Sequence, residues 1–127
     1  MDKTVFNSLS AHLHNIKVVN NLSRQKMLVM IICAMLKSRS VVLPKLAQHL
    51  NNSVKTDSNE TRLRDFFRET AIDYEAVALL VVALLKQQPN LEIRLTVDRT
   101  NWEFGNHSTN ILMIIASKGT FSTPLYW

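Results

Sequence analysis

Hydrophobic and polar positions follow two different periods along this chain, and the period changes near residue 90. Before that point apolar residues recur every three or four positions, as Phe6, Leu9 and Leu13 do, which is typical of helices that bury one face. The first 89 residues contain two prolines and no glycine, so little interrupts helices there. Periodicity and end signals together predict five helices, over residues 4–20, 23–37, 44–50, 57–70 and 73–88.

From residue 91 the period falls to two. Apolar and polar residues alternate over 91–98, which predicts a strand that has one apolar face and ends at Asp98. A hairpin turn is expected over 102–107, where one of the two glycines of the chain can take a positive φ. The six apolar residues 111–116 predict a second strand covered on both faces, and a third strand is expected from Phe121.

These elements predict an α+β chain in two regions, a helical region over residues 1–89 and a strand region over 90–127. A length of 127 residues fits one domain, or one small domain with part of another. Three strands need a covering layer, and the third would leave an exposed apolar edge. We therefore expect the strand region to be the less stable one.

Charge divides the chain in a similar way. Residues 1–56 carry eight lysines and arginines against a single acid, Asp2, for a net +7, while residues 57–127 carry seven bases and nine acids, for −2; together they give the +5 of the whole chain. A strongly basic half predicts a polyanionic partner such as nucleic acid. A charge that serves only solubility is the alternative.

The helices at 44–50 and 57–70, with a polar loop between them, have the arrangement of a DNA-binding pair. Arginines spaced along an exposed helix can reach phosphates and base edges in a major groove. The cations expected to contact DNA are Lys45, Arg62, Arg64 and Arg68. Asp65 and Glu69 stand among these arginines, so a self-paired, solvent-exposed face is the alternative.

The cysteine content and the apolar runs bear on the compartment. Cys33 is the single cysteine, so neither a disulfide framework nor a cysteine-based zinc site is available, as suits a reducing cytoplasm. No apolar stretch typical of a signal peptide follows the first residues. The longest apolar runs, 27–36 and 76–85, have ten residues each, against the ~20 of a membrane-spanning helix. We expect a cytoplasmic protein without a membrane partner.

Three strings in the strand region resemble the bacterial cut-and-paste insertion-sequence transposases, the "insertion sequence four" group of DDE enzymes. The strings are Val97-Asp98-Arg99-Thr100-Asn101-Trp102, Asn110-Ile111-Leu112 and Pro124-Leu125-Tyr126-Trp127. The resemblance is specific over 91–127 and weak over 23–90, where this family often has more adjacent arginines. It implies that residues 90–127 begin an RNase H-like catalytic core, with the three strings on its first three strands, and that residues 1–89 bind DNA.

The resemblance also implies a role for Asp98. In this family the corresponding aspartate is the first of three catalytic carboxylates, which hold Mg²⁺ or Mn²⁺ for strand transfer at a phosphodiester. The second aspartate and the glutamate would lie beyond Trp127, which implies a truncated transposase that is inactive by itself. On spacing alone, a lone acid at a strand end is a cap or a turn residue.

The partners that the resemblance implies are double-stranded DNA at terminal inverted repeats and, in the parent enzyme, a second copy. Two other functions stay open from the sequence. One is a stand-alone DNA-binding or inhibitory module without catalysis. The other is a helical interaction protein without a nucleic-acid partner, for which charge reversal at Arg62, Arg64 and Arg68 would leave DNA binding unchanged.

Overall fold

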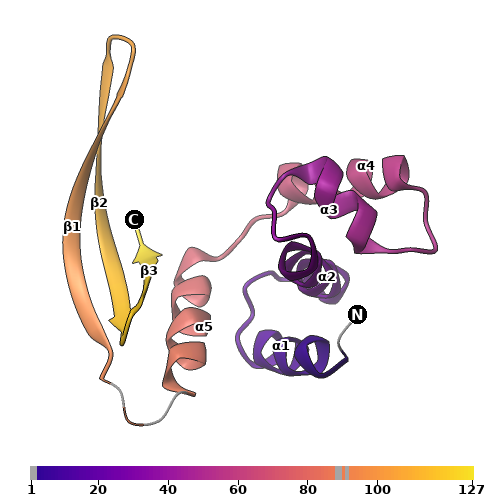
Figure 1. Cartoon of the computed structure of the whole chain (residues 1–127), viewed down its shortest axis with the longest axis horizontal. Coiled ribbons are helices and arrows are strands. Elements are labelled where there is room, and N and C mark those ends of the chain that lie inside the picture. The colour runs from indigo at the N-terminus through magenta and orange to yellow at the C-terminus, as the bar shows by residue number, and fades with distance from the viewer. Residues whose placement is uncertain (1–2, 88–89, 91) are drawn as a thin grey trace. The chain divides into compact units, whose positions relative to one another are not determined.

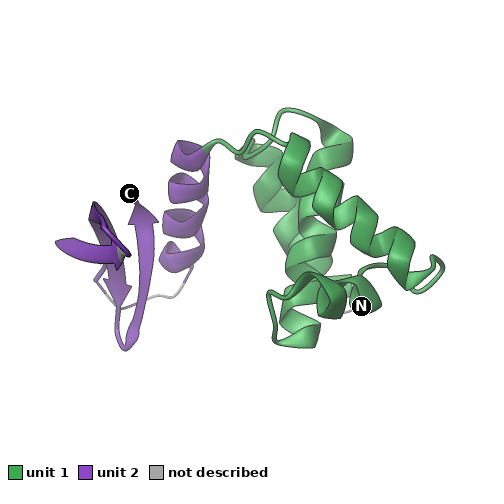
Figure 2. Cartoon of the chain, turned by 90° about the horizontal axis from the view of Figure 1, so that it is seen from above, with its two compact units in different colours: residues 1–73 green, residues 74–127 purple. Residues whose placement is uncertain are grey.

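The computed structural model describes residues 3–87, 90 and 92–127, and it is an α+β structure: five helices followed by a three-stranded antiparallel sheet (Figure 1). The helices are α1 (Lys3–Asn15), α2 (Leu22–Ser38), α3 (Leu43–Leu50), α4 (Thr56–Glu69) and α5 (Tyr74–Lys86). The strands are β1 (Arg94–Phe104), β2 (His107–Lys118) and β3 (Phe121–Tyr126). The chain divides into two compact units, residues 1–73 (unit 1) and 74–127 (unit 2), coloured separately in Figure 2.

The helix ends show where local sequence decides the structure. Helix α2 begins after Asn21, whose side chain accepts a hydrogen bond from the backbone N–H of Ser23. It ends at Arg39, which takes a left-handed conformation with φ 49°, and α3 then runs at 107° to α2. The first helix ends at Asn15 rather than near residue 20, whereas the other four lie within two residues of their predicted bounds.

Unit 1 has a continuous core where α2, α3 and α4 meet. Its buried members are Ile31, Ala34, Leu46, Ala47, Leu50, Leu63 and Phe66. The buried side chain of Asn59 ties α4 to the end of α3, because its Nδ2 donates to the carbonyl oxygens of Ala47 at 3.0 Å and Asn51 at 2.9 Å. These two bonds satisfy carbonyls that the helix end and the following loop leave without a helical partner.

The sheet of unit 2 has the order β1-β2-β3 with antiparallel neighbours. The predicted end of the first strand at Asp98 was wrong: β1 continues to Phe104, and Asp98 lies mid-strand opposite Met113. The hairpin turn is therefore shorter than the predicted 102–107, and it includes Gly105 at φ 58°. The polar residues after Asp98 belong to a long twisted ribbon rather than to a loop.

Helix α5 covers part of one face of this sheet. On that face Ala116 is fully buried, and Lys118 donates through Nζ to the carbonyl oxygen of Leu85 in α5 at 2.5 Å. On the same face, Leu95 of β1 lies opposite Ala116, yet Leu95, Val97 and Leu112 are 64%, 65% and 63% exposed. The prediction that β2 is covered on both faces was therefore wrong, because one helix is too narrow to shield the hairpin.

Strand β3 forms the edge of the sheet beside α5. It pairs with β2 through an irregular register between Ile114 and Ile115, and it contains Pro124, which has no N–H to offer. The ring of Trp127 packs edge-on against Tyr74 at 5.7 Å between centroids, yet Phe121 remains 57% exposed. The predicted apolar edge is present, but it is short and irregular.

Candidate nucleic-acid interface

The arginines of α4 are largely engaged with acids of their own helix. Arg64 pairs with Glu60 one turn earlier, and Arg68 pairs with Asp65 at 2.6 Å and with Glu69 at 2.9 Å. The hydrogen bond to Glu69 and the charge of Asp65 raise the pKa of Arg68 above its usual value. With four acids against three arginines, this helix offers a phosphate backbone no net positive charge.

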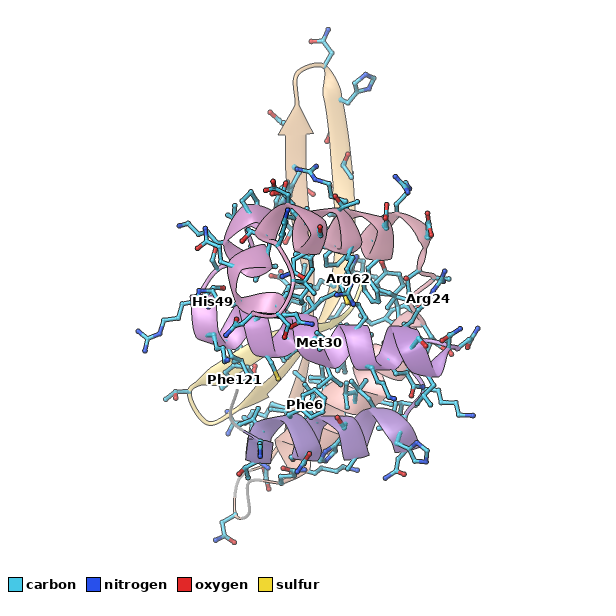
Figure 3. All side chains as sticks on the ribbon, turned by 90° about the vertical axis from the view of Figure 1, so that its right-hand side faces the viewer. Phe6, Arg24, Met30, His49, Arg62 and Phe121 are labelled. Atoms are coloured by element: carbon cyan, nitrogen blue, oxygen red, sulfur yellow. The ribbon has the colours of Figure 1, made fainter. Side chains whose placement is uncertain are left out.

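Arg62 lies apart from these pairs, on the side of α4 that faces α2. It lines a shallow cavity of about 260 Å³ together with Arg24 of α2 and the acids Asp65 and Glu69, and Figure 3 labels both arginines. Arg24 donates through Nη1 to the carbonyl oxygen of Glu69 at 2.8 Å. The structure thus brings together two arginines that are far apart in the sequence, which spacing along one helix does not reveal.

The cations of α1, α2 and α3 lie in a part of the sequence that contains no acid after Asp2. The stretch from Lys3 to Thr56 carries eight lysines and arginines and no aspartate or glutamate. Three of the cations, Lys37, Arg39 and Lys45, stand on the last turn of α2, its C-cap and the first turn of α3; we call them the α2–α3 corner. All three are exposed, and no ion pair involves them within the described part of the chain.

Asp98 is an exposed carboxylate in the middle of β1. Its Oδ1 accepts the backbone N–H of Arg99 at 2.8 Å, and the guanidinium of Arg99 donates to Asn110 on β2 at 3.0 Å. The strings that carry the resemblance lie on three successive strands: Asp98 on β1, residues 110–112 on β2 and residues 124–126 on β3.

A divalent ion would find little at Asp98 beyond this one side chain. Over residues 3–87, 90 and 92–127, no three His, Cys, Asp or Glu side chains come together in a way that could hold a metal ion. Magnesium prefers about six oxygen ligands, several of them carboxylates or phosphates. Asp98 is therefore a candidate ligand only, and the described residues do not fit a complete two-metal centre.

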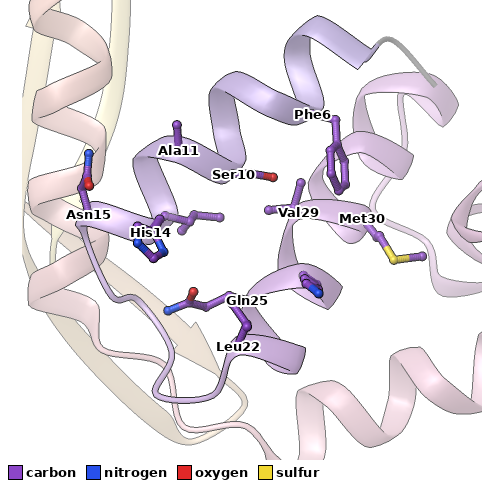
Figure 4. A pocket seen from close by; sticks show the side chains of 11 residues that line it. Phe6, Ser10, Ala11, His14, Asn15, Leu22, Gln25, Val29 and Met30 are labelled. Atoms are coloured by element: carbon purple, nitrogen blue, oxygen red, sulfur yellow. The ribbon is translucent and has the colours of Figure 1, made fainter.

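A further feature, absent from the sequence-based predictions, is an apolar cavity of about 550 Å³ between α1 and α2 (Figure 4). Its size lies in the range of small-molecule sites. The apolar lining includes Phe6, Leu13, Val29 and Met30, and the polar side chains at its rim include Ser10, His14 and Lys26. Periodicity predicts that both helices have apolar faces, but it does not show that α1 packs loosely enough to leave this space.

Comparison with known proteins adds no relative: no family model, no curated protein and no solved structure matches the chain. Within the described residues no single helix is long and apolar enough to cross a membrane, and α2 with α3 meets the length and composition only as a pair bent by 107°.

Proposed function

We propose that the chain binds double-stranded DNA through unit 1 and that it serves DNA transposition, as its resemblance to the insertion-sequence transposases implies. The observation that carries the DNA-binding part is the stretch from Lys3 to Thr56, which holds eight lysines and arginines without one acid. Uncompensated cations on a folded surface release counterions from DNA and supply most of the affinity for the phosphate backbone.

The α2–α3 corner is the part of unit 1 that we expect to meet the phosphates. Lys37, Arg39 and Lys45 are exposed and form no ion pair within the described residues, whereas Arg64 and Arg68 are held by acids at hydrogen-bond distance. An arginine that must leave a carboxylate to reach a phosphate gains less than one that is free. Of the four cations predicted from the sequence, Lys45 thus becomes the strongest candidate, and Arg62 follows.

The transposition part of the proposal rests on the resemblance and on the placement of its strings. Residues 98, 110–112 and 124–126 fall on three consecutive antiparallel strands, which is the placement that the resemblance implies. Asp98 would be the first metal-binding carboxylate, with Mg²⁺ or Mn²⁺ as the ion that activates the phosphodiester. The remaining ligands would have to come from groups outside the described residues.

A salt series of DNA binding tests the proposal. We expect the full chain to bind a duplex at low salt, measured by fluorescence anisotropy, and the logarithm of the binding constant to fall linearly with the logarithm of salt concentration, by roughly 0.9 per phosphate contact. A chain that shows no affinity for duplex DNA at low salt would falsify the DNA-binding proposal and would favour an interaction protein without a nucleic-acid partner.

Two variants with the same change in net charge locate the interface. Lys45→Gln should lower affinity and reduce the salt slope by about one, while Arg64→Gln, whose cation already pairs with Glu60, should leave the slope nearly unchanged. If the two variants lose affinity equally, net charge alone is responsible. If Arg64→Gln loses more, the interface lies on α4, as the sequence first suggested.

A stand-alone DNA-binding or inhibitory module is the second candidate, because the described residues contain no group of three His, Cys, Asp or Glu side chains that could hold a metal ion. Both candidates predict DNA binding, so affinity alone does not separate them. A transposition assay with an intact enzyme of the same element separates them. If this chain, added to that assay, competes for the terminal inverted repeats and cleaves no DNA itself, the result favours the module.

A further inference from the structure

Strand β1 leaves one long edge of the sheet without a partner. It extends over 11 residues from Arg94 to Phe104 without proline or glycine, and its register with β2 has no irregularity. Within the described residues no strand pairs with its outer side (Figure 1). The opposite edge, β3, has 6 residues, a proline and a register shift. Soluble proteins commonly blunt their edges in the way β3 is blunted, and β1 lacks those devices.

A hydrogen bond shows which backbone groups of β1 point to the open side. The N–H of Arg99 donates to the side chain of Asp98 at 2.8 Å, so it is not used in the ladder with β2. Backbone groups alternate in direction along an antiparallel strand. The N–H and C=O groups of Leu95 and Val97 therefore point outward as well and are available to another strand.

We propose that β1 pairs with β1 of a second copy of this chain, antiparallel and centred on Thr96, to make a continuous six-stranded sheet. A two-fold axis perpendicular to the sheet places the same face of both copies on the same side of the joined sheet. It places Leu95 opposite Val97 of the second copy and Arg94 opposite Asp98 of the second copy, each pair occurring twice. The outward groups of Leu95 and Val97 then form the hydrogen bonds that join the copies.

Charge and apolar complementarity together select this register and favour a second copy over an unrelated strand. Centring the pair on Asp98 or on Arg99 would place like charges directly opposite each other, and centring it on Val97 or on Thr100 would place an aliphatic residue opposite a charged one. Centring it on Asn101 would pair Arg99 with Glu103, but it would place Asp98 opposite Phe104 and leave Leu95 and Val97 outside the paired stretch. Centring on Thr96 places opposite charges together and aliphatic side chains together, and both kinds of pair stabilise antiparallel sheets. It also gives Leu95 and Val97, nearly two-thirds exposed in one copy, a lateral apolar neighbour.

The pairing uses unit 2 alone, so it does not rest on the proposed DNA binding by unit 1. It does engage the carboxylate of Asp98, for which Arg94 of the second copy and a divalent ion would compete.

A single introduced thiol tests the register. In the proposed dimer Thr96 faces Thr96 of the second copy in a non-hydrogen-bonded pair, where Cα atoms lie about 4.5 Å apart, within the range of a disulfide. Thr96→Cys in the full chain should cross-link on mild oxidation, measured by mass under non-reducing conditions.

Thr100→Cys is the matched control, because its symmetry mate lies eight residues farther along the pair, about 27 Å away. The native Cys33 is 4% exposed and should react little. Equal cross-linking of the two variants overturns the register.

A charge swap tests the partner without a thiol. Asp98→Arg and Arg94→Asp each replace two ion pairs per dimer by like-charge contacts, so each should raise the dimer dissociation constant by about tenfold or more in sedimentation equilibrium. The double variant restores both pairs with reversed polarity and should return the constant towards that of the native chain. A native chain that stays monomeric at every soluble concentration, or a double variant no better than the single ones, overturns the proposal. Far-ultraviolet circular dichroism confirms that each variant is folded.

Discussion

The two units of this chain bury their apolar residues to very different extents. In unit 1 the helices cover one another, and Leu46, Ala47 and Leu63 are fully buried. In unit 2 a single helix covers part of one sheet face, and Leu95 and Leu112 stay nearly two-thirds exposed. A helical bundle supplies its own covering layers, whereas a sheet depends on elements added to it. The difference therefore concerns what surrounds each element rather than how apolar its sequence is.

The largest expected effect comes from opening the core of unit 1. Leu63 is fully buried between α4 and its neighbours, so Leu63→Ala removes contacts and leaves a cavity that costs about 2–5 kcal/mol. Since small domains have a total stability of about 5–15 kcal/mol, this variant should show a large shift of its urea midpoint, followed by far-ultraviolet circular dichroism.

The positions of the tryptophans allow the two units to be followed separately. Trp102 and Trp127, the two tryptophans of the chain, both lie in unit 2, so their fluorescence reports unit 2, while most helical residues belong to unit 1. In the native chain the fluorescence transition should precede the helical one. In Leu63→Ala the helical transition should move and the fluorescence transition should stay; movement of both would mean that the units unfold together.

The next effect in size concerns the amide of Asn59. Asn59→Ala removes the hydrogen bonds to Ala47 and Asn51. The carbonyl oxygen of Asn51 keeps the N–H of Val54, but that of Ala47 loses this donor, and the loss of the two bonds should cost about 1–3 kcal/mol. The same unfolding measurement of the helical transition checks it. Asn59→Gln is the matched control, because it keeps the amide but lengthens the side chain; a full rescue by glutamine would contradict the close geometry described above.

A smaller effect is expected at the start of α2. Asn21 caps this helix through the N–H of Ser23, so Asn21→Ala should destabilise unit 1 by about 1 kcal/mol, and Asn21→Ser should retain most of the stability. Urea unfolding of the two variants side by side gives the difference. Equal stabilities would show that this cap contributes little beyond what solvent can replace.

The smallest effect is expected on the open part of the sheet. Leu112→Thr keeps a residue that favours strands at a position that is 63% exposed, so the fluorescence-detected stability of unit 2 should change by no more than about 0.5 kcal/mol. A loss above about 1 kcal/mol would mean that another chain or a partner covers this face in solution. The two units would then differ less in how far their apolar residues are buried.

The sequence predicts the elements of this fold well and their surroundings poorly. Periodicity and end signals located the five helices and three strands of the described residues, because both depend only on neighbouring residues. It failed at residues 99–104, whose polar side chains resemble a turn although they extend β1. Alternation also shows that Leu95 and Val97 share a face, but it does not show whether anything covers that face, since covering elements come from elsewhere in the chain.

The candidate interface was likewise predictable from the sequence only in part. The ion pairs Glu60–Arg64 and Asp65–Arg68 have helical spacing and agree with the self-paired alternative drawn from the sequence. The approach of Arg24 to Arg62 depends on how α2 packs against α4 and has no local signal. The resemblance supplied a role for Asp98, and DNA binding, metal binding and transposition by this chain stay predictions.

Cys33 is a native probe of how often unit 1 opens. It is the single thiol of the protein and is 4% exposed within α2, so a thiol reagent can reach it mainly when the surrounding helices separate. The rate of its labelling under native conditions then measures how often unit 1 opens, without any engineered probe. If bound DNA holds the α2–α3 corner in place, Cys33 should be labelled more slowly. The labelling rate of the native sequence would then detect DNA binding without an added probe.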